Sequence, residues 1–181
     1  MGESRPLRGR AATRFTPQRG GTRGSAFARC GGIVRVGFAA AMPAHVHTQS
    51  FRVVMAEVDL SQIHFTAIYR WMDRGWSEWL AEVGHPFTRL LEEGPGVPIV
   101  DSRCSFLARI LIDDEITLQT RVGGIGRTSF RSRHRFTRDD EMVARGELVH
   151  VCVNRATREP VPVPAWLREA ADDEDVPPDV A

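Results

Sequence analysis

The sequence lacks lysine, long apolar runs and any regular cysteine pattern. No lysine occurs among its 181 residues, and because no function requires lysine to be excluded everywhere, this absence reflects genomic base composition. No apolar run approaches the roughly 20 residues that a membrane-spanning helix needs. The three cysteines, Cys30, Cys104 and Cys152, are odd in number and are not spaced as metal ligands, which argues against a disulfide framework or a metal site. We therefore expect a cytoplasmic protein that uses no membrane, metal or other cofactor.

The charge is distributed unevenly along the chain. The formal net charge is only +1, yet eight arginines and a single acid, Glu3, precede residue 50, whereas Asp172 to Asp175 form an acidic stretch. Residues 1–48 are rich in Arg, Gly, Ser, Thr and Ala without sustained periodicity, so they cannot bury enough apolar surface to offset the entropy of ordering. We expect a disordered extension at 1–48, one folded domain at 49–168 and a disordered acidic tail at 169–181.

Three interpretations of the first 48 residues compete. Their arginines are compatible with a basic tail that contacts nucleic acid or a membrane surface. The weak apolar patch from Gly37 to Ala44 ends in small residues, as a targeting peptide does, although the segment before it is too long for one. We favour the third interpretation, in which translation starts at Met42 and residues 1–41 precede the true start.

One long helix after residue 65 is the clearest predicted element. Thr66 is a residue type that favours the N-cap position. Apolar or small residues then recur at helical spacing on one face: Ile68, Trp71, Met72, Gly75, Trp79 and Val83. Gly84 is placed to end the helix, and Pro86 prevents its continuation. The Trp-rich face predicts a core helix against which a sheet packs.

Strand-like segments fill most of the remaining domain. They cover residues 51–58, 100–110, 115–122, 127–137 and 141–153, with a short edge strand at 159–163 and a terminal turn at 166–167. The segment 115–122 shows the cleanest alternation of apolar and polar residues. A strand, a long helix and then several antiparallel strands indicate an α+β fold, with one sheet of five or six strands packed on the helix.

Three short motifs carry a resemblance to a known family. They are Val58-Asp59-Leu60-Ser61-Gln62-Ile63-His64-Phe65-Thr66-Ala67-Ile68-Tyr69, Asp113-Asp114-Glu115-Ile116-Thr117-Leu118 and Gly126-Arg127-Thr128-Ser129-Phe130. Through them, residues 52–163 resemble the 4-hydroxybenzoyl-CoA thioesterase family of hot-dog proteins. The resemblance implies a single hot-dog domain, acyl-CoA thioesterase activity, and a homodimer or homotetramer with active sites at the dimer interface. The sequence departs from the family at Gln62, where glycine is usual, and at Thr66, where an aromatic residue or histidine is common.

Hydrolysis of a thioester requires stabilisation of a developing oxyanion and a base or nucleophile at the carbonyl carbon. The free N–H groups at the start of the helix, around Phe65 to Ala67, would supply the first requirement. The resemblance makes Asp59 the base or nucleophile, although a turn aspartate that caps its own backbone is the structural alternative. His64 would orient water or shuttle a proton, unless it is a partly buried residue bonded to backbone at the dimer interface. The same resemblance places Thr66 in the catalytic site and Phe65 and Tyr69 at the substrate.

Arginine occupies four of the five alternate positions from 127 to 135, with Ser129 at the other, which would place Arg127, Arg131, Arg133 and Arg135 on one face of a strand. Coenzyme A is a polyanion, and guanidinium groups bind phosphate bidentately. Arg127 matches the basic position of the family and is the predicted phosphate ligand, with Ser129 beside it. The alternative is a solvated sheet face. No aromatic platform is interleaved with these arginines, so we do not expect nucleic-acid binding.

Two other functions remain open on the same fold. The spacing from Asp59 to His64 is that of hot-dog enoyl-CoA hydratases, although the Asn and Pro of that motif are missing. A non-catalytic acyl-binding protein would leave Asp59 with a purely structural role. The acyl carrier, coenzyme A or acyl carrier protein, is also open. The remaining candidates His85, His134, His150, Cys104 and Cys152 are predicted to be structural.

Overall fold

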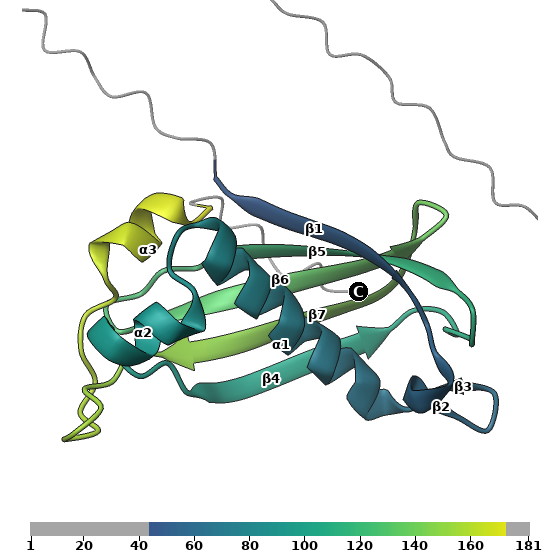
Figure 1. Ribbon diagram of the computed structural model, residues 1–181, viewed down its shortest axis with the longest axis horizontal. Coiled ribbons are helices and arrows are strands. Elements are labelled where there is room, and N and C mark those ends of the chain that lie inside the picture. Colours follow the sequence, from purple (N-terminus) through teal and green to yellow (C-terminus); the bar gives the residue numbers. More distant parts are fainter. Residues whose placement is uncertain (1–43, 173–181) are drawn as a thin grey trace, which may run out of the picture. The chain divides into compact units, whose positions relative to one another are not determined.

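A five-stranded antiparallel sheet and one long helix form the domain (Figure 1). The computed structural model describes residues 44–172, so the alternative start at Met42 and most of the predicted extension and acidic tail lie outside the described residues. The elements are β1 (Val46–Arg52), η1 (Met55–Glu57), β2 (Val58–Asp59), β3 (Gln62–Ile63), α1 (Phe65–Glu82), α2 (Phe87–Glu93), β4 (Ile99–Phe106), β5 (Glu115–Gly123), β6 (Ser129–Arg138), β7 (Glu141–Val151) and α3 (Ala165–Ala170). No helix among the described residues is long and apolar enough to cross a membrane.

The strands follow the order β1-β5-β6-β7-β4, and β2 and β3 form a separate two-residue pairing. Figure 1 shows α1 lying across one face of the sheet, with α2 and α3 near its C-terminal end and β2 and β3 near its start. The α+β class and the single antiparallel sheet predicted from the sequence are confirmed. The two edges are β1 and β4, because these strands have a hydrogen-bonded neighbour on one side only.

The apolar face of α1 provides the centre of the core. Its buried residues are Ala67, Ile68, Trp71, Met72, Gly75, Trp76, Trp79 and Leu80. The glycines at the contact allow the helix to lie close to the sheet. A methyl group at Gly75 would collide with Thr120 and Leu118, and one at Gly146 would collide with Met72. The helix ends as predicted, with Gly84 in the left-handed region at φ 80° just after the C-cap Val83.

Several predicted boundaries differ from the structure near the start of the domain. The first strand runs over Val46–Arg52 instead of 51–58, so the fold begins before residue 49. The reason is its partner: Arg52 pairs with Glu115, the first residue of β5, and no strand continues beyond it. The chain then turns through η1. The strand predicted at 100–110 likewise ends at Phe106, where both Leu107 and Ala108 donate to the Val143 carbonyl.

The second half of the domain also departs from the prediction in places. β6 begins at Ser129, so Arg127 precedes the strand and does not share the face of Arg131, Arg133 and Arg135. The edge strand expected at 159–163 does not form as a continuous strand. The segment makes an isolated pairing of Val153 with Pro160, and Val161 N and Val163 N donate to the Cys152 and Arg127 carbonyls. The terminal turn is the helix α3, and Asp172 N donates to the Val122 carbonyl at 2.7 Å. The folded chain therefore continues past residue 168.

Candidate active site

Asp59 lies in the tight turn that joins β2 and β3. Its backbone pairs with Gln62, and its carbonyl accepts a 2.7 Å hydrogen bond from Ser61 N. Leu60 between them has φ 57°, a left-handed conformation that is uncommon for a residue other than glycine, and its side chain is 101% exposed. The Asp59 carboxylate is exposed and forms no hydrogen bond or ion pair within residues 44–172. Non-glycine residues held in the left-handed region occur often at functional sites, which makes this turn a candidate.

Glu57, two residues earlier, is the other acid near this turn, and its carboxylate has a structural role. It accepts a 2.6 Å hydrogen bond from the indole of Trp71 on α1 and a 3.1 Å bond from Val54 N. The Glu57 carbonyl also accepts from His64 N at 2.7 Å. Glu57 therefore ties the Asp59 turn to α1, whereas the Asp59 carboxylate has no partner among the described residues. The sequence pattern missed this residue because it lies within the segment predicted as a strand.

His64, not Thr66, is the N-cap of α1. The His64 imidazole Nδ1 accepts from Thr66 N at 3.3 Å and lies 2.7 Å from the Thr66 hydroxyl, which also accepts from Arg70 at 3.3 Å. The helix starts earlier than predicted because this imidazole supplies the acceptor that the hydroxyl of Thr66 was expected to provide. Thr66 is the second helical residue, and its hydroxyl lies between His64 and Arg70.

The same cap restricts which backbone N–H groups can meet a substrate. Thr66 N donates to the His64 side chain, and Ala67 N donates to the His64 carbonyl at 2.8 Å. Of the three N–H groups predicted for the oxyanion, only that of Phe65 lacks an acceptor among the described residues. The Phe65 ring is 61% exposed next to it, whereas Tyr69, one turn later, packs against the core.

Arg127 and Ser129 lie at the opposite end of the sheet from Asp59. The β5 register shows this, because Glu115 lies beside Arg52 and Gly123 lies beside Arg131. β5 has nine residues, and at a rise of about 3.3 Å per residue the two ends are about 27 Å apart. The Arg127 side chain is exposed. One chain therefore does not bring Arg127 and Ser129 together with Asp59, His64 and Thr66.

Of the other titratable candidates, His134, His150 and Cys152 are buried in the core, whereas His85 and Cys104 are half-buried. His134 and His150 are 2% and 0% exposed, and burial lowers their pKa values to about 3 and about 4. Burial raises the pKa of the Cys104 and Cys152 thiols to about 11, so neither is a thiolate near neutral pH. Within residues 44–172, no group of three or more His, Cys, Asp or Glu side chains is arranged to hold a metal ion.

Comparison with known proteins identifies related sequences and folds. The sequence profile described as thioesterase-like superfamily matches residues 53–171. A 1,4-dihydroxy-2-naphthoyl-CoA hydrolase of Synechococcus sp. (strain WH7803) is 29% identical over 117 residues, which cover 58% of this chain and 76% of that protein.

Two solved structures show the same fold. A gentisyl-coenzyme A thioesterase superposes with a TM-score of 0.62 at 29% identity, covering 68% of this chain and 98% of its own. The 4-hydroxybenzoyl-CoA thioesterase of Pseudomonas sp. strain CBS-3 superposes with a TM-score of 0.63 at 25% identity, covering 71% of this chain and 100% of its own. The fold and the family resemblance found in the sequence are thereby confirmed.

Proposed function

Because the chain belongs to the thioesterase-like superfamily, we propose that it hydrolyses an acyl-CoA thioester to the free acid and coenzyme A. The observation that carries this proposal is the Asp59 carboxylate, which is exposed and unpaired in a turn that leads through β3 directly into the start of α1. The turn is fixed by the Glu57 carboxylate on Trp71, so the position of Asp59 relative to α1 is set before substrate binds.

In the proposed reaction the thioester carbonyl points at the N-terminus of α1. The unpaired Phe65 N–H and the positive end of the helix dipole stabilise the negative charge that develops on the carbonyl oxygen. Asp59 either attacks the carbonyl carbon or removes a proton from the water that attacks it. When water attacks, the C–S bond breaks and the free acid forms directly. When Asp59 attacks, the C–S bond breaks to leave an anhydride between Asp59 and the acyl group, which water then hydrolyses to the free acid and the Asp59 carboxylate. In both routes the thiolate of coenzyme A leaves and takes up a proton. The His64 imidazole caps α1 and, together with the Thr66 hydroxyl, holds this end of the helix in place. In the proposed complex both side chains lie beside the thioester carbonyl.

We propose an aromatic acyl group as the substrate to test first. The related proteins named above act on naphthoyl, gentisyl and hydroxybenzoyl thioesters. Beside Asp59 the chain exposes apolar side chains that an aryl group can contact, among them Phe65. A panel of aromatic and medium-chain acyl-CoA and acyl carrier protein thioesters, with release of free thiol as the signal, tests both the activity and the substrate class. Hydration of an enoyl-CoA without thiol release would contradict the proposal.

A second copy of the chain would bring the separated residues together. The β4 edge carries three exposed apolar residues. Ile99 is 45% exposed, Val100 is 59% exposed and Phe106 is 47% exposed. Twofold pairing of antiparallel β4 strands would place the Ile99 end of one copy beside the Phe106 end of the other. Ile99 lies at the end of the sheet where Arg127 is found. The other end of β4 is near Asp59, because Ile63 N of β3 donates to the carbonyl of Ile110, four residues after Phe106. We therefore propose a homodimer with sites at its interface, paired further into a homotetramer.

The β4 interface predicts a specific effect on assembly. We expect Phe106→Asp to convert the protein to a monomer and to abolish most turnover, because a buried charge would be placed in the interface. The matched change Thr48→Asp, on the exposed face of the other edge strand β1, should leave both unchanged. Sedimentation at micromolar concentration measures the result. A wild-type monomer, or a dimer that Phe106→Asp leaves intact, would contradict this interface.

Arg127 provides a test of the coenzyme A end of the site. Arg127→Ala is expected to raise the KM for acyl-CoA about tenfold with little change in kcat, because a remote phosphate contact contributes uniform binding. The same enzyme should process a pantetheine thioester, which lacks the nucleotide phosphates, with an unchanged KM. Arg74→Ala, which removes an exposed arginine from α1, is the matched control. An equal response of the two substrates would show that Arg127 binds no phosphate.

A further inference from the structure

The face of the sheet that points away from α1 carries a cluster of arginines. On β5 and β6 alternate residues are buried on the α1 side, and the residues between them point outwards. The register places Arg121 beside Arg133, and Arg135 directly opposite Arg145 of β7. Together with Arg131, two residues before Arg133, these side chains share one patch of surface, which we call the arginine face.

Described acids neutralise only part of the arginine face. The Glu147 carboxylate on β7 lies 3.3 Å from Arg131 Nε and 3.2 Å from Arg133 Nε, so one acid serves two arginines. Arg135 and Arg145 have no ion pair with the described part of the chain, although like charges directly opposite each other destabilise a strand pair. The face therefore carries an excess of positive charge, which suits an acidic ligand.

The last described residue already lies against this face. Arg121 Nη1 donates to the Asp172 carboxylate at 2.8 Å, and Asp172 N donates to the Val122 carbonyl at 2.7 Å. The Asp172 carbonyl lies over Gly123, because a Cβ on Gly123 would be 2.6 Å from that oxygen and 3.9 Å from Arg133 Nη1. The chain therefore reaches the outward side of β5 at a position that only glycine leaves open.

The residues that follow Asp172 have the complementary charge. No basic residue occurs among residues 173–181, and their acids are Asp173, Glu174, Asp175 and Asp179. Arg145 lies two strands across and four residues along the sheet from Gly123, which is about 16 Å. The chain from Asp172 to Asp179 can span about 23 Å when extended, so its acids can reach every arginine of the face.

We propose that the acidic segment 173–179 binds to the arginine face of its own chain. Asp172 fixes where the segment starts, and the unbalanced positive charge attracts the acids that follow. A second copy of the chain does not suit this face, because pairing the face with itself would bring arginines together. The inference is independent of the proposed hydrolysis, since none of these residues has a role in that reaction.

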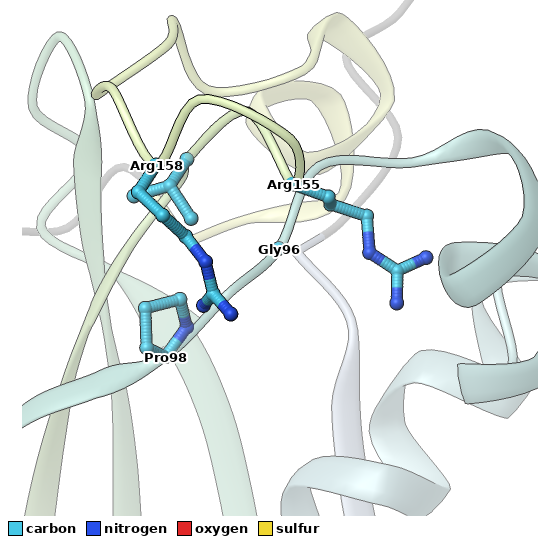
Figure 2. A pocket seen from close by; sticks show the side chains of 5 residues that line it. Gly96, Pro98, Arg155 and Arg158 are labelled. Carbon is cyan, nitrogen blue, oxygen red and sulfur yellow. The ribbon is translucent and has the colours of Figure 1, made fainter.

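A second cationic surface lies beside the start of β4. It is a hollow of about 470 Å³ that is lined by Gly96, Pro98, Val153, Arg155 and Arg158. Figure 2 shows the Arg155 and Arg158 side chains extending on either side of Gly96. The contacts of Asp172 with Arg121 and Gly123 favour the arginine face, and the hollow supplies a matched control.

Disulfide trapping in the full chain tests the location. Gln119 lies on the arginine face beside Arg135, and the exposed Ala156 lies between the two arginines of the hollow, so neither change removes an arginine. The two variants are Gln119→Cys/Val176→Cys and Ala156→Cys/Val176→Cys. Under mild oxidation the Gln119 variant should form an intramolecular disulfide about tenfold faster than the Ala156 variant, because several weak ion pairs hold the segment on the arginine face. Mass spectrometry of unreduced peptides identifies the bonded pair.

The acids of the segment provide the decisive control. Adding Asp173→Asn/Glu174→Gln/Asp175→Asn should slow the Gln119 disulfide about tenfold, and salt at about 1 M should do the same, because both remove the attraction between charges. If the rate does not depend on these acids, the inference is wrong. Faster bonding of the Ala156 variant would assign the segment to the hollow, and disulfides formed only between copies would assign it to a second chain.

Heparin, a polyanion, measures whether the face is covered. The variant Asp173→Asn/Glu174→Gln/Asp175→Asn should bind heparin about tenfold more tightly than wild type, because the arginine face becomes accessible. The control Asp73→Asn/Glu78→Gln/Glu92→Gln removes as many exposed acids from α1 and α2 and should change heparin binding little. Equal binding by wild type and the segment variant would overturn the inference and leave the face open to an acidic partner protein.

Discussion

Asp59→Asn is expected to lower thioesterase turnover by about two orders of magnitude or more, the range for loss of a general base or nucleophile. Asparagine keeps the size and the hydrogen-bonding shape of the side chain but removes both chemical roles. The substitution should not unfold the protein, because the Asp59 carboxylate makes no hydrogen bond or ion pair with the described residues. Glu57 cannot replace it, since its carboxylate is held by Trp71 and Val54. Steady-state assays and the melting temperature measure the two effects.

Two further variants make this result specific. Asp73→Asn removes an exposed carboxylate from α1 and should leave turnover unchanged. His64→Ala should cost much less than Asp59→Asn in a thioesterase, because His64 caps the helix and does not attack the carbonyl. A hydratase, in which Asp and His act on water together, would lose comparable activity in both variants. Near-normal turnover of Asp59→Asn would show that this mechanism is wrong and would favour an acyl-binding role.

The stability of the fold is expected to fall steeply below about pH 6.5. Between α1 and the sheet, Thr120, His134, Ser132 and His150 form a buried chain of hydrogen bonds of 2.9–3.1 Å. Burial lowers the pKa of His134, with a further contribution from neighbouring His150, and burial lowers that of His150. The unfolded chain, with ordinary histidine pKa values of 6.5, binds these protons first. The stability that the two neutral histidines contribute is therefore fully present above pH 6.5. It decreases as the pH falls towards their pKa values in the folded protein.

The slope gives the size of this effect. Each buried histidine contributes roughly 1 kcal/mol of unfolding free energy per pH unit, so the pair contributes roughly 2 kcal/mol per unit between about pH 5 and 6. Glu82 affects the stability at lower pH. Burial raises its pKa, but hydrogen bonds from His45 and His47 outweigh this and leave it below 4.5. Urea unfolding at several pH values measures the slope.

A variant separates the histidines from other titrating groups. His134→Asn should reduce the slope by roughly 1 kcal/mol per pH unit, whatever its effect on stability near pH 7. The slope is the informative quantity, because loss of packing or of a hydrogen bond alone would lower stability equally at every pH. If the wild-type unfolding free energy is the same at pH 5 and pH 7, the buried histidines are not the acid-sensitive element.

The elements that the sequence predicted well are those defined by local periodicity. The helical spacing from Ile68 to Trp79 identified the core helix, and Gly84 marked its end. The alternation at 115–122 identified β5, whose even-numbered residues are buried. Asp59, His64 and the start of α1 lie within a few residues of each other in the chain, so the sequence alone predicts that they are neighbours, and their grouping in one site stays a prediction. Their catalytic roles stay predictions.

The tertiary structure decided the features that depend on distant segments. The N-cap is His64 and not the predicted Thr66, because the His64 imidazole accepts a hydrogen bond from Thr66 N. Trp71 makes Glu57 a structural anchor, and the register of β5 and β6 places Arg127 at the far end of the sheet from Asp59. The pairing of Gly96 with Val153 joins segments more than fifty residues apart in the chain. Local spacing fixes helices and alternating strands by short-range sterics, whereas strand order, register and edges arise from pairings between remote residues, which no single segment of the sequence specifies.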